Sequence, residues 1–326
     1  MQGKEASEQE TKVKSSVGID TSKCWLDVHV SPADERLRVA NSYAGIRQLK
    51  RWLLRHEIAL VVIEATGKWH RQVHRSLAAS AIPVAVVDPY RVRRFAQAHG
   101  IFAKTDRLDA RVLASFASMM TPSVRAPAPQ AMAELAELVV ARASAIEAQA
   151  ALKNQLGTTE CKFLKRQLDR RIARAGKDIA ALDGEILKRI KADNALARRY
   201  AILTSIPGFG FAVAATLIAC LAEIGSATAK QIGMLAGLAP IANQSGEHDG
   251  MRVIWGGRPA VRRVLYLAAL SAARFNADMK AFYQRLTTNG KPPKAALIAV
   301  ARKLVVLANT LVGQDRCWEL RMPKHA

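Results

Sequence analysis

The sequence of 326 residues has few cysteines, and their positions exclude the common cysteine frameworks. The four cysteines are Cys24, Cys161, Cys220 and Cys317. They form no C-x-x-C pair, and no histidines accompany them at zinc-site spacing. The sequence therefore argues against a disulfide-stabilised domain and against a zinc ribbon, and it fits a reducing cytoplasm.

Long hydrophobic runs are also missing. The stretch "FAVAATLIACLAEIG" is too short to span a bilayer, and "AALIAVARKLVVLANTLVG" is interrupted by Arg302 and Lys303. The first residues, "MQGKEASEQETKVK", are polar and lack the apolar segment of a signal peptide. We therefore expect a soluble cytoplasmic protein with no membrane partner, and a disordered tail over residues 1–13.

Acidic residues are scarce relative to basic ones. The 49 Lys and Arg residues exceed the 27 Asp and Glu residues and give a formal net charge of +22. An excess of this size attracts polyanions, so nucleic acid is the first candidate partner. An anionic membrane surface ranks far behind, because no basic amphipathic helix stands apart from the core patterns.

Residues 14–120 have the pattern of an α/β domain. Three strand-like segments, "VKSSVGID", "CWLDVHV" and "RLRVANSY", come first. Two β-branched runs, "IALVVIEATG" and "IPVAVVDPYR", alternate with helical segments and are typical of strands buried on both faces. Asp88-Pro89 is a helix start, with Asp88 as its cap. This order predicts one sheet with helices.

Residues 121–200 are expected to form a linker and a coiled coil. "TPSVRAPAPQ" is rich in proline, and the segment after it has no β signal. A heptad-like seam occupies Leu168, Ile172, Ala175, Ile179, Leu182 and Ile186. A break near Gly157 favours a helical hairpin, although an ordinary long helix would show the same spacing. Residues 201–326 read as a mainly α-helical domain whose glycine-rich segment, "LAPIANQSGEHDGMRVIWGGRP", has weak β character.

Four acidic residues form the main candidate site. Asp20 and Glu64 each end a predicted strand, and Asp106 and Asp109 lie three residues apart on a predicted helix. If they converge, a cation must balance their repulsion, and oxygen-only ligands suit Mg²⁺ or Mn²⁺. Each acid also has a structural interpretation: Asp106 and Asp109 could cap their helix, Asp20 could cap a turn, and Glu64 could pair with Lys68. Lys104, Arg107 and Arg111 are candidate phosphate contacts.

Ser245 lies between glycines and arginines, in "NQSGEHDGMRVIWGGR". A hydrolase triad with His248 and Asp249 is poorly supported, because the G-x-S-x-G context is absent. Ordinary turn chemistry is a second interpretation. In a third, the serine attacks a DNA phosphate. Arg252 and Arg258 would then neutralise that phosphate, and Arg262 is a further candidate nucleic-acid contact.

Five segments together resemble the DEDD transposases of bacterial insertion sequences, the IS-one-ten/IS-eleven-eleven group that includes the Piv-type invertases. They are "VGIDTSKCWLDVHV", "VVIEATGKWH", "VVDPYRVRRFAQAHGIFAKTDRLDARVLA", "SIPGFGFAVAATLIA" and "QSGEHDGMRVIWGGRPAVRRVLYLAAL". They occur in the family's order and cover nearly the whole chain. Asp88 is a departure, since asparagine is expected there in many relatives, but it lies outside the acidic quartet.

The resemblance implies an RNase H-like (RuvC-like) domain over residues 14–120, whose metal ligands match Asp20, Glu64, Asp106 and Asp109. It implies a transposase domain over residues 201–326, whose nucleophile matches Ser245. It further implies donor and target DNA, a structured guide (bridge) RNA, and a dimer or tetramer. Two other functions stay open from the residues alone: a metal-dependent nuclease or junction resolvase in which water attacks, and a non-enzymatic nucleic-acid scaffold.

Overall fold

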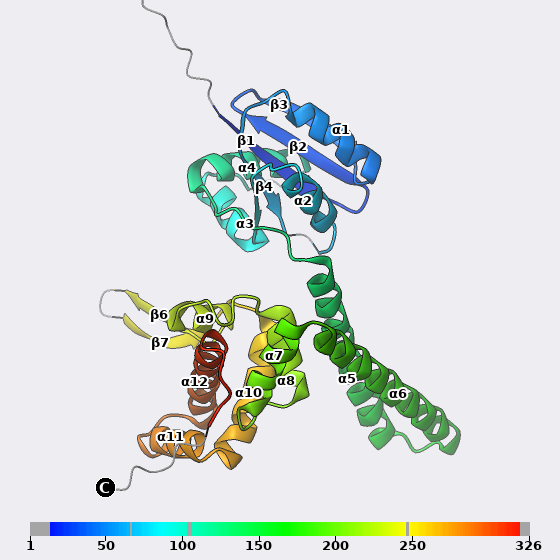
Figure 1. The fold of residues 1–326 in the computed structure, drawn as a ribbon, viewed down its shortest axis with the longest axis vertical. Helices are drawn as coiled ribbons and strands as arrows, with labels where there is room; N and C mark the ends of the chain where they lie inside the picture. The colour runs from blue at the N-terminus through cyan, green and yellow to red at the C-terminus, as the bar shows by residue number, and fades with distance from the viewer. Residues whose placement is uncertain (1–13, 66, 103–105, 246–247, 320–326) are drawn as a thin grey trace, which may run out of the picture. The chain divides into compact units, whose positions relative to one another are not determined.

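The computed structural model describes residues 14–65, 67–102, 106–245 and 248–319; for residues 106–108, 243–245 and 248–251 it describes the backbone alone. The expected tail over residues 1–13 lies outside the described residues. The chain divides into two compact units, with the boundary between Ala128 and Pro129. This boundary falls within the proline-rich segment (Figure 1).

Within its described residues, the first unit is a five-stranded sheet with four helices (Figure 1). Its strands are β1 Ser15–Thr21, β2 Trp25–Ser31, β3 Glu35–Ala40, β4 Ile58–Glu64 and β5 Val84–Val87. Its helices are α1 Tyr43–Leu53, α2 His70–Ala78, α3 Pro89–Ala98 and α4 Asp106–Met120. The five strands confirm the sequence prediction of an α/β domain in this part of the chain.

The strand order is β3-β2-β1-β4-β5. The first three strands pair antiparallel, whereas β1 pairs with β4 and β4 with β5 in parallel. This arrangement puts the carboxyl ends of β1 and β4 at the same edge of the sheet. In the β1–β4 ladder, Gly18 is the partner of Val62, and Ile19 is the partner of Ile63. Asp20 and Glu64 are therefore the next residues on the two neighbouring strands.

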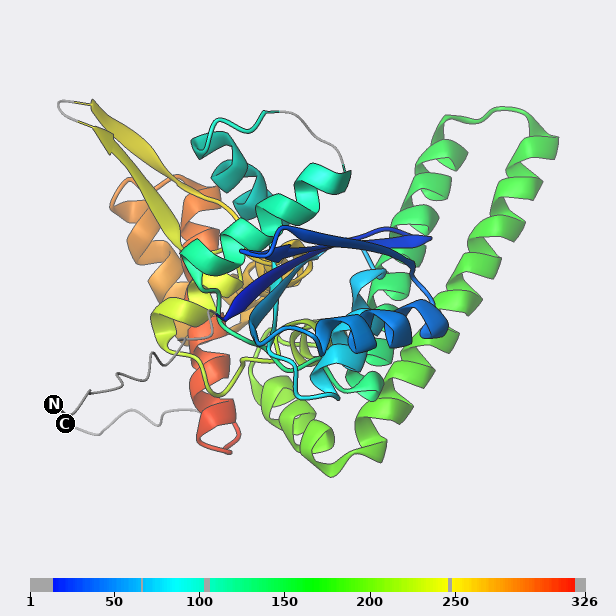
Figure 2. The ribbon, with the colours of Figure 1, turned by 90° about the horizontal axis from the view of Figure 1, so that it is seen from above.

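Each face of the sheet has its own helices and its own core (Figure 2). The alternate residues Val17, Ile19 and Ile63 pack with α1 and α2. The intervening residues, such as Val62, pack with α3 and α4, where Leu113 is fully buried. Side chains alternate along β2, with Leu26, Val28 and Val30 in the α1–α2 core.

The second unit begins with a pair of long helices, α5 Gln130–Thr158 and α6 Lys162–Ala192, packed side by side (Figure 2). The break between them spans residues 159–161, next to the predicted break at Gly157. Leu168 and Ile186, from the predicted seam, are buried. The structure therefore confirms a helical hairpin, and a supercoiled coiled coil stays a prediction.

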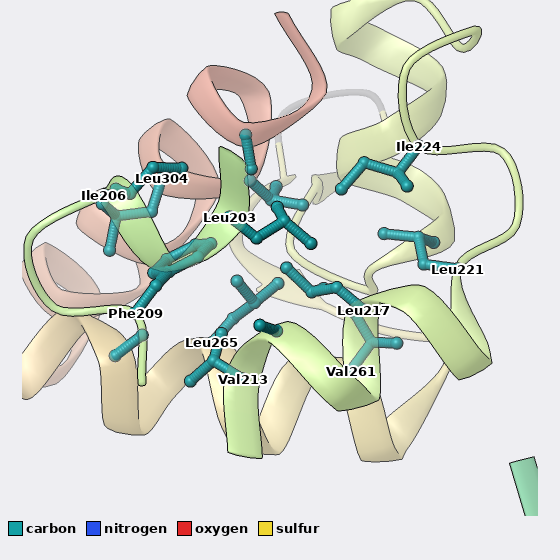
Figure 3. Close-up of a cluster of buried hydrophobic side chains, with 14 of the residues drawn as sticks. Leu203, Ile206, Phe209, Val213, Leu217, Leu221, Ile224, Val261, Leu265 and Leu304 are labelled. Atoms are coloured by element: carbon teal, nitrogen blue, oxygen red, sulfur yellow. The ribbon is translucent and has the colours of Figure 1, made fainter. Parts of the chain in front are cut away.

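The rest of the second unit is mainly helical. Its elements are α7 Asn194–Ser205, α8 Phe211–Cys220, α9 Ala229–Leu235, β6 Pro240–Ser245, β7 His248–Ile254, α10 Pro259–Phe275, α11 Ala277–Thr288 and α12 Pro293–Gly313. Figure 3 shows part of the core that α7, α8, α10 and α12 share, including Leu203, Leu217, Leu265 and Leu304. The prediction of a mainly α-helical segment in this part of the chain is confirmed.

The helix α12 has the length and apolar composition of a membrane span, and it is the one such helix among the described residues. Half of its most apolar stretch is buried within the protein. Val300, Leu304 and Ala308 belong to the core that α12 shares with α10. These contacts are those of a core helix, and they explain its hydrophobic character without a bilayer.

Candidate functional site

Asp20 and Glu64 lie on the α4 face of the sheet. Side chains alternate along a strand, so Asp20 projects to the same face as Gly18, and Glu64 to the same face as Val62. Val62 belongs to the core formed with α4, and Gly18 is packed against α4. Both carboxylates are partly exposed. The structure therefore places two of the predicted acids on one face, at the ends of neighbouring parallel strands.

The helix α4 approaches this face closely because residue 18 is glycine. A Cβ atom at Gly18 would lie 2.7 Å from Leu113 Cβ and would overlap the backbone of Ala110 and Ala114. Asp109 directly precedes Ala110, and its side chain is partly exposed. Asp20 is two residues from Gly18 along β1. The close contact between Gly18 and Ala110 thus brings the segment carrying Asp109 to the strand carrying Asp20.

The remaining residues of "KTDRLDAR" are only partly described. The helix α4 begins at Asp106, so both aspartates lie in its first turn, where negative charge is favourable. The side chains of Asp106 and Arg107 lie outside the description, as does Lys104 altogether. Arg111 is exposed on α4. The capping and metal interpretations of Asp106 therefore both stay predictions.

The donor chemistry of Asp20, Glu64 and Asp109 fits a hard divalent cation, since all three offer carboxylate oxygens. Among the side chains that the structure describes, no group of three His, Cys, Asp or Glu residues is close enough to hold a metal ion. The acidic side chains that the structure describes thus share one face of the sheet but do not by themselves form a complete set of metal ligands. The alternative partner of Glu64, Lys68, lies with its ammonium 5.1 Å from the Trp69 ring centroid.

A second row of charged groups adjoins Asp20, and sequence reasoning missed it. Asp27 is the ladder partner of Asp20, and Arg38 is the ladder partner of Asp27. Arg38 donates to both carboxylate oxygens of Asp27, at 2.7 Å and 2.9 Å, and Asp27 is 8% exposed. Apolar and polar residues alternate in "CWLDVHV", and this pattern shows that Asp27 lies on the face of the strand opposite to Leu26 and Val28. Only the antiparallel register shows that it lies opposite Asp20.

His29 lies on the same face of β2, opposite Gly18. It is buried, and its Nδ1 atom has no hydrogen-bond partner in the described part of the chain. Burial lowers the pKa of His29, with smaller contributions from the positive charges of Arg36 and Arg111, although Asp34 acts in the opposite direction. The burial effect is the larger one, because the Asp34 carboxylate is 3.6 Å from Nε2 and exposed to solvent. A neutral His29 is expected near pH 7.

Ser245 ends β6, at the tip of a two-stranded ribbon in the second unit (Figure 2). Its ladder partner is His248, and Gln244 pairs with Asp249. Glycines shape the base of this ribbon. Gly257 has φ of +63°, and a Cβ atom there would overlap the backbone of Gly237. For Ser245 the structure thus describes the position of the backbone and not that of the side chain.

The three arginines predicted near Ser245 differ in their surroundings. Arg252 is exposed on β7. Arg258 donates to both carboxylate oxygens of Glu223, at 2.6 Å and 2.7 Å, so its charge is already balanced. Arg262 donates to the carbonyl oxygen of Gly256 at 2.7 Å. Arg252 is therefore the most exposed of the three, and the roles of Arg252, Arg258 and Arg262 in nucleic-acid binding all stay predictions.

Comparison with known proteins identifies the family. Residues 17–159 match a family model described as "Transposase", the DEDD transposase model of IS110. Residues 200–284 match a second model, described as "Transposase IS116/IS110/IS902 family". The two models together match parts of both structural units. The chain belongs to the IS110-type DEDD transposases. The resemblance drawn from the five sequence segments is thereby confirmed, and the protein is a DNA transposase or recombinase.

Two pilin gene-inverting proteins are similar to this transposase along its length. Those of Moraxella bovis and Moraxella lacunata are each 27% identical over 322 residues, covering 95% of this chain and 99% of theirs. An uncharacterised 43.6 kDa protein of insertion element IS110 from Streptomyces coelicolor is 30% identical over 124 residues, covering 37% of this chain and 31% of its own. The family thus joins transposases with proteins named for gene inversion.

Proposed function

We propose that this transposase cuts and rejoins DNA through two chemical centres, a divalent-cation site on the first unit and the nucleophile Ser245 on the second. The observation that carries the proposal is the placement of Asp20 and Glu64, at adjacent strand ends on one face, with α4 packed on that face by Gly18. Two carboxylates at neighbouring strand ends repel each other, and a bound cation would balance that repulsion. The first unit is then a RuvC-like domain.

In the proposed metal site, Asp20, Glu64, Asp106 and Asp109 hold Mg²⁺ or Mn²⁺. Such an ion would neutralise charge that develops on phosphate oxygens and would orient the scissile phosphate. The carboxylates themselves position the ion, and the nearby basic side chains, including Lys104, Arg107 and Arg111, would hold the DNA backbone. The observations supporting this are the oxygen-only donors and their shared face.

In the proposed strand cleavage, Ser245 Oγ attacks a DNA phosphorus. A P–Oγ bond forms as the bond to the leaving strand breaks; the hydroxyl proton leaves Oγ, and the leaving oxygen takes up a proton. The reverse reaction joins the phosphate to a new strand end, so no external energy source is needed. Two observations support Ser245 as the nucleophile: its position at the tip of the ribbon, and the exposed side chain of Arg252 on the neighbouring strand.

We further propose that a structured RNA, paired with donor and target DNA, selects the sites. This step rests on the family resemblance, and the net charge of +22 is consistent with it.

The protein would act as a dimer or tetramer in the bacterial cytoplasm, at the nucleoid. A composite site, with acids of one protomer meeting Ser245 of another, is part of the proposal. The ribbon supports it, because Ile241 and Val253, ladder partners near Ser245, are exposed apolar residues.

A metal-dependent nuclease or junction resolvase is the second candidate. The observation that favours it is that Asp20, Glu64 and α4 all belong to the first unit, so that unit could activate water without the serine. One variant distinguishes the two functions, and a second tests the metal site that both require. Ser245→Ala should abolish strand exchange in a recombinase and leave cleavage in a nuclease. Glu64→Gln should abolish both activities in either enzyme, and full activity of this variant would contradict both.

A further inference from the structure

The outward face of α6 collects basic residues opposite its contact with α5. Between Lys162 and Lys177 the helix has seven Lys and Arg residues and one acidic residue, Asp169. At about 100° per residue, five of the seven fall within about 120° on the side opposite the buried Leu168. These five exposed residues, here called the α6 stripe, are Lys162, Arg166, Arg170, Arg174 and Lys177.

The charges of the α6 stripe are mostly unbalanced. Arg174 pairs with Asp178 at 3.0 Å, and the other four members have no ion-pair partner in the described part of the chain. Elsewhere on the hairpin the pattern differs, since Arg189 pairs with both Glu134 and Glu185. Like charges at i, i+4 destabilise a helix by about 0.2–0.5 kcal/mol per pair. A polyanion bound along the stripe would remove this penalty.

We propose that the α6 stripe binds the backbone of a DNA duplex, a contact that rests on the proposed action on DNA. The stripe extends for about 22 Å along the helix, because 15 residues rise 1.5 Å each. A duplex of that length carries about 13 phosphates. Lys and Arg contacts to phosphates position a duplex without reading its sequence, so the stripe holds DNA of any sequence.

The test is the salt dependence of duplex binding by the full chain, in chelator so that cleavage does not interfere. The stripe variant carries Gln at Lys162, Arg166, Arg170 and Lys177. If four phosphate contacts are lost, the slope of log affinity against log salt falls by about 3.6. Between 50 and 200 mM salt the unaltered protein should then lose about 150-fold more affinity than the stripe variant.

The matched control removes the same four charges from another exposed region of the second unit, by Gln at Arg274, Lys280, Lys291 and Lys294. It should keep the slope of the unaltered protein. Equal slopes for the stripe variant and the unaltered protein would overturn the proposal. So would a slope change seen only with an RNA duplex, or a changed oligomeric mass with an unchanged DNA slope. Because no metal or cleavage is involved, the result is independent of the proposed chemistry.

A separate observation supports a role for Asp27 and Arg38 beside the acids. Asp27 is opposite Asp20 in the ladder, and Arg38 holds Asp27 by two hydrogen bonds of 2.7 Å and 2.9 Å. We infer that this pair is a positioning pair. Arg38 balances the charge of Asp27, so that this charge adds less to that of Asp20 at the cation site.

The test measures Mn²⁺ binding directly, by electron paramagnetic resonance of the free ion, and uses the full chain. Asp27→Asn should weaken Mn²⁺ binding and Arg38→Gln should strengthen it. A unit charge about 8 Å from a divalent ion in water corresponds to about sixfold in each direction. The double variant should be within about twofold of the unaltered protein.

A merely structural pair would lower binding in both single variants. Shifts of the same sign, or a double variant no better than the weaker single variant, would therefore overturn the inference. If the unaltered protein binds no Mn²⁺, the proposed metal site fails together with this pair. If the unaltered protein binds Mn²⁺ and neither single variant changes that binding, only the role of the pair fails.

Discussion

Substitution of Gly18 by alanine tests the contact that brings α4 to the sheet. The new Cβ would lie 2.7 Å from Leu113 Cβ, and an ordinary contact begins near 3.4 Å. The helix must therefore retreat by about 0.7 Å at Leu113, and further at Ala110, where the overlap is with backbone. Overpacking of this kind typically costs about 1–3 kcal/mol. We expect the free energy of opening of β1 to fall by that amount, measured by hydrogen exchange of its amides.

The same shift should also reduce the rate of strand cleavage. Asp109 adjoins Ala110, so a retreat of α4 separates Asp109 from Asp20 and Glu64. Misplacement of a reacting group by about 1 Å can reduce the rate about 100-fold. Strand cleavage by Gly18→Ala should therefore fall about 100-fold at a temperature where the protein remains folded.

The control is Gly184→Ala on α6. Gly184 is exposed, and a Cβ atom there meets no atom within 4 Å. This substitution should stabilise the helix by about 0.5–1 kcal/mol and leave cleavage unchanged. If Gly18→Ala retained full stability and full activity, the close packing of α4 on β1 would not be what positions the acids.

Three further predictions follow from the site. Cleavage should require Mg²⁺ or Mn²⁺ and stop in excess chelator, and Asp106→Asn should abolish it while nucleic-acid binding persists; full activity in chelator would exclude the metal site. Because burial lowers the pKa of His29, the unfolded chain binds its proton more readily, so stability should fall as the pH drops through the ordinary value of about 6.5. His29→Gln should remove that fall in melting temperature between pH 7.5 and 5.5, and an unchanged profile would show that His29 is not its source. A mixture of the Asp106→Asn and Ser245→Ala proteins should regain part of the activity each lacks, and no recovery would argue against a composite site.

The strands of the first unit could be predicted because their patterns are strong. The runs containing Val61–Ile63 and Val84–Val87 are buried on both faces, so they have no competing helical period. The positions of Asp20 and Glu64 at strand ends follow directly. The role of Gly18 could not be predicted, because it depends on which helix later in the chain packs against β1.

Contacts between segments that are far apart in the chain could not be predicted from the sequence either. Arg258 pairs with Glu223, which lies 35 residues earlier, in the turn between α8 and α9. The β6–β7 ribbon was only weakly indicated, because its glycines reduce strand propensity, and its register is set by tertiary packing. The position of Asp27 opposite Asp20 likewise required the register of the β1–β2 pair.

The most direct test of the proposed mechanism is to identify the residue that becomes joined to DNA. A suicide substrate, nicked so that the cleaved strand end is lost, should trap the covalent intermediate, and mass spectrometry of the digested protein should locate it. We predict a phosphodiester adduct on the peptide containing Ser245, and none with Ser245→Ala. An adduct that persists in Ser245→Ala, or DNA cleaved by the unaltered protein with no adduct at all, would contradict the serine mechanism and favour attack by water.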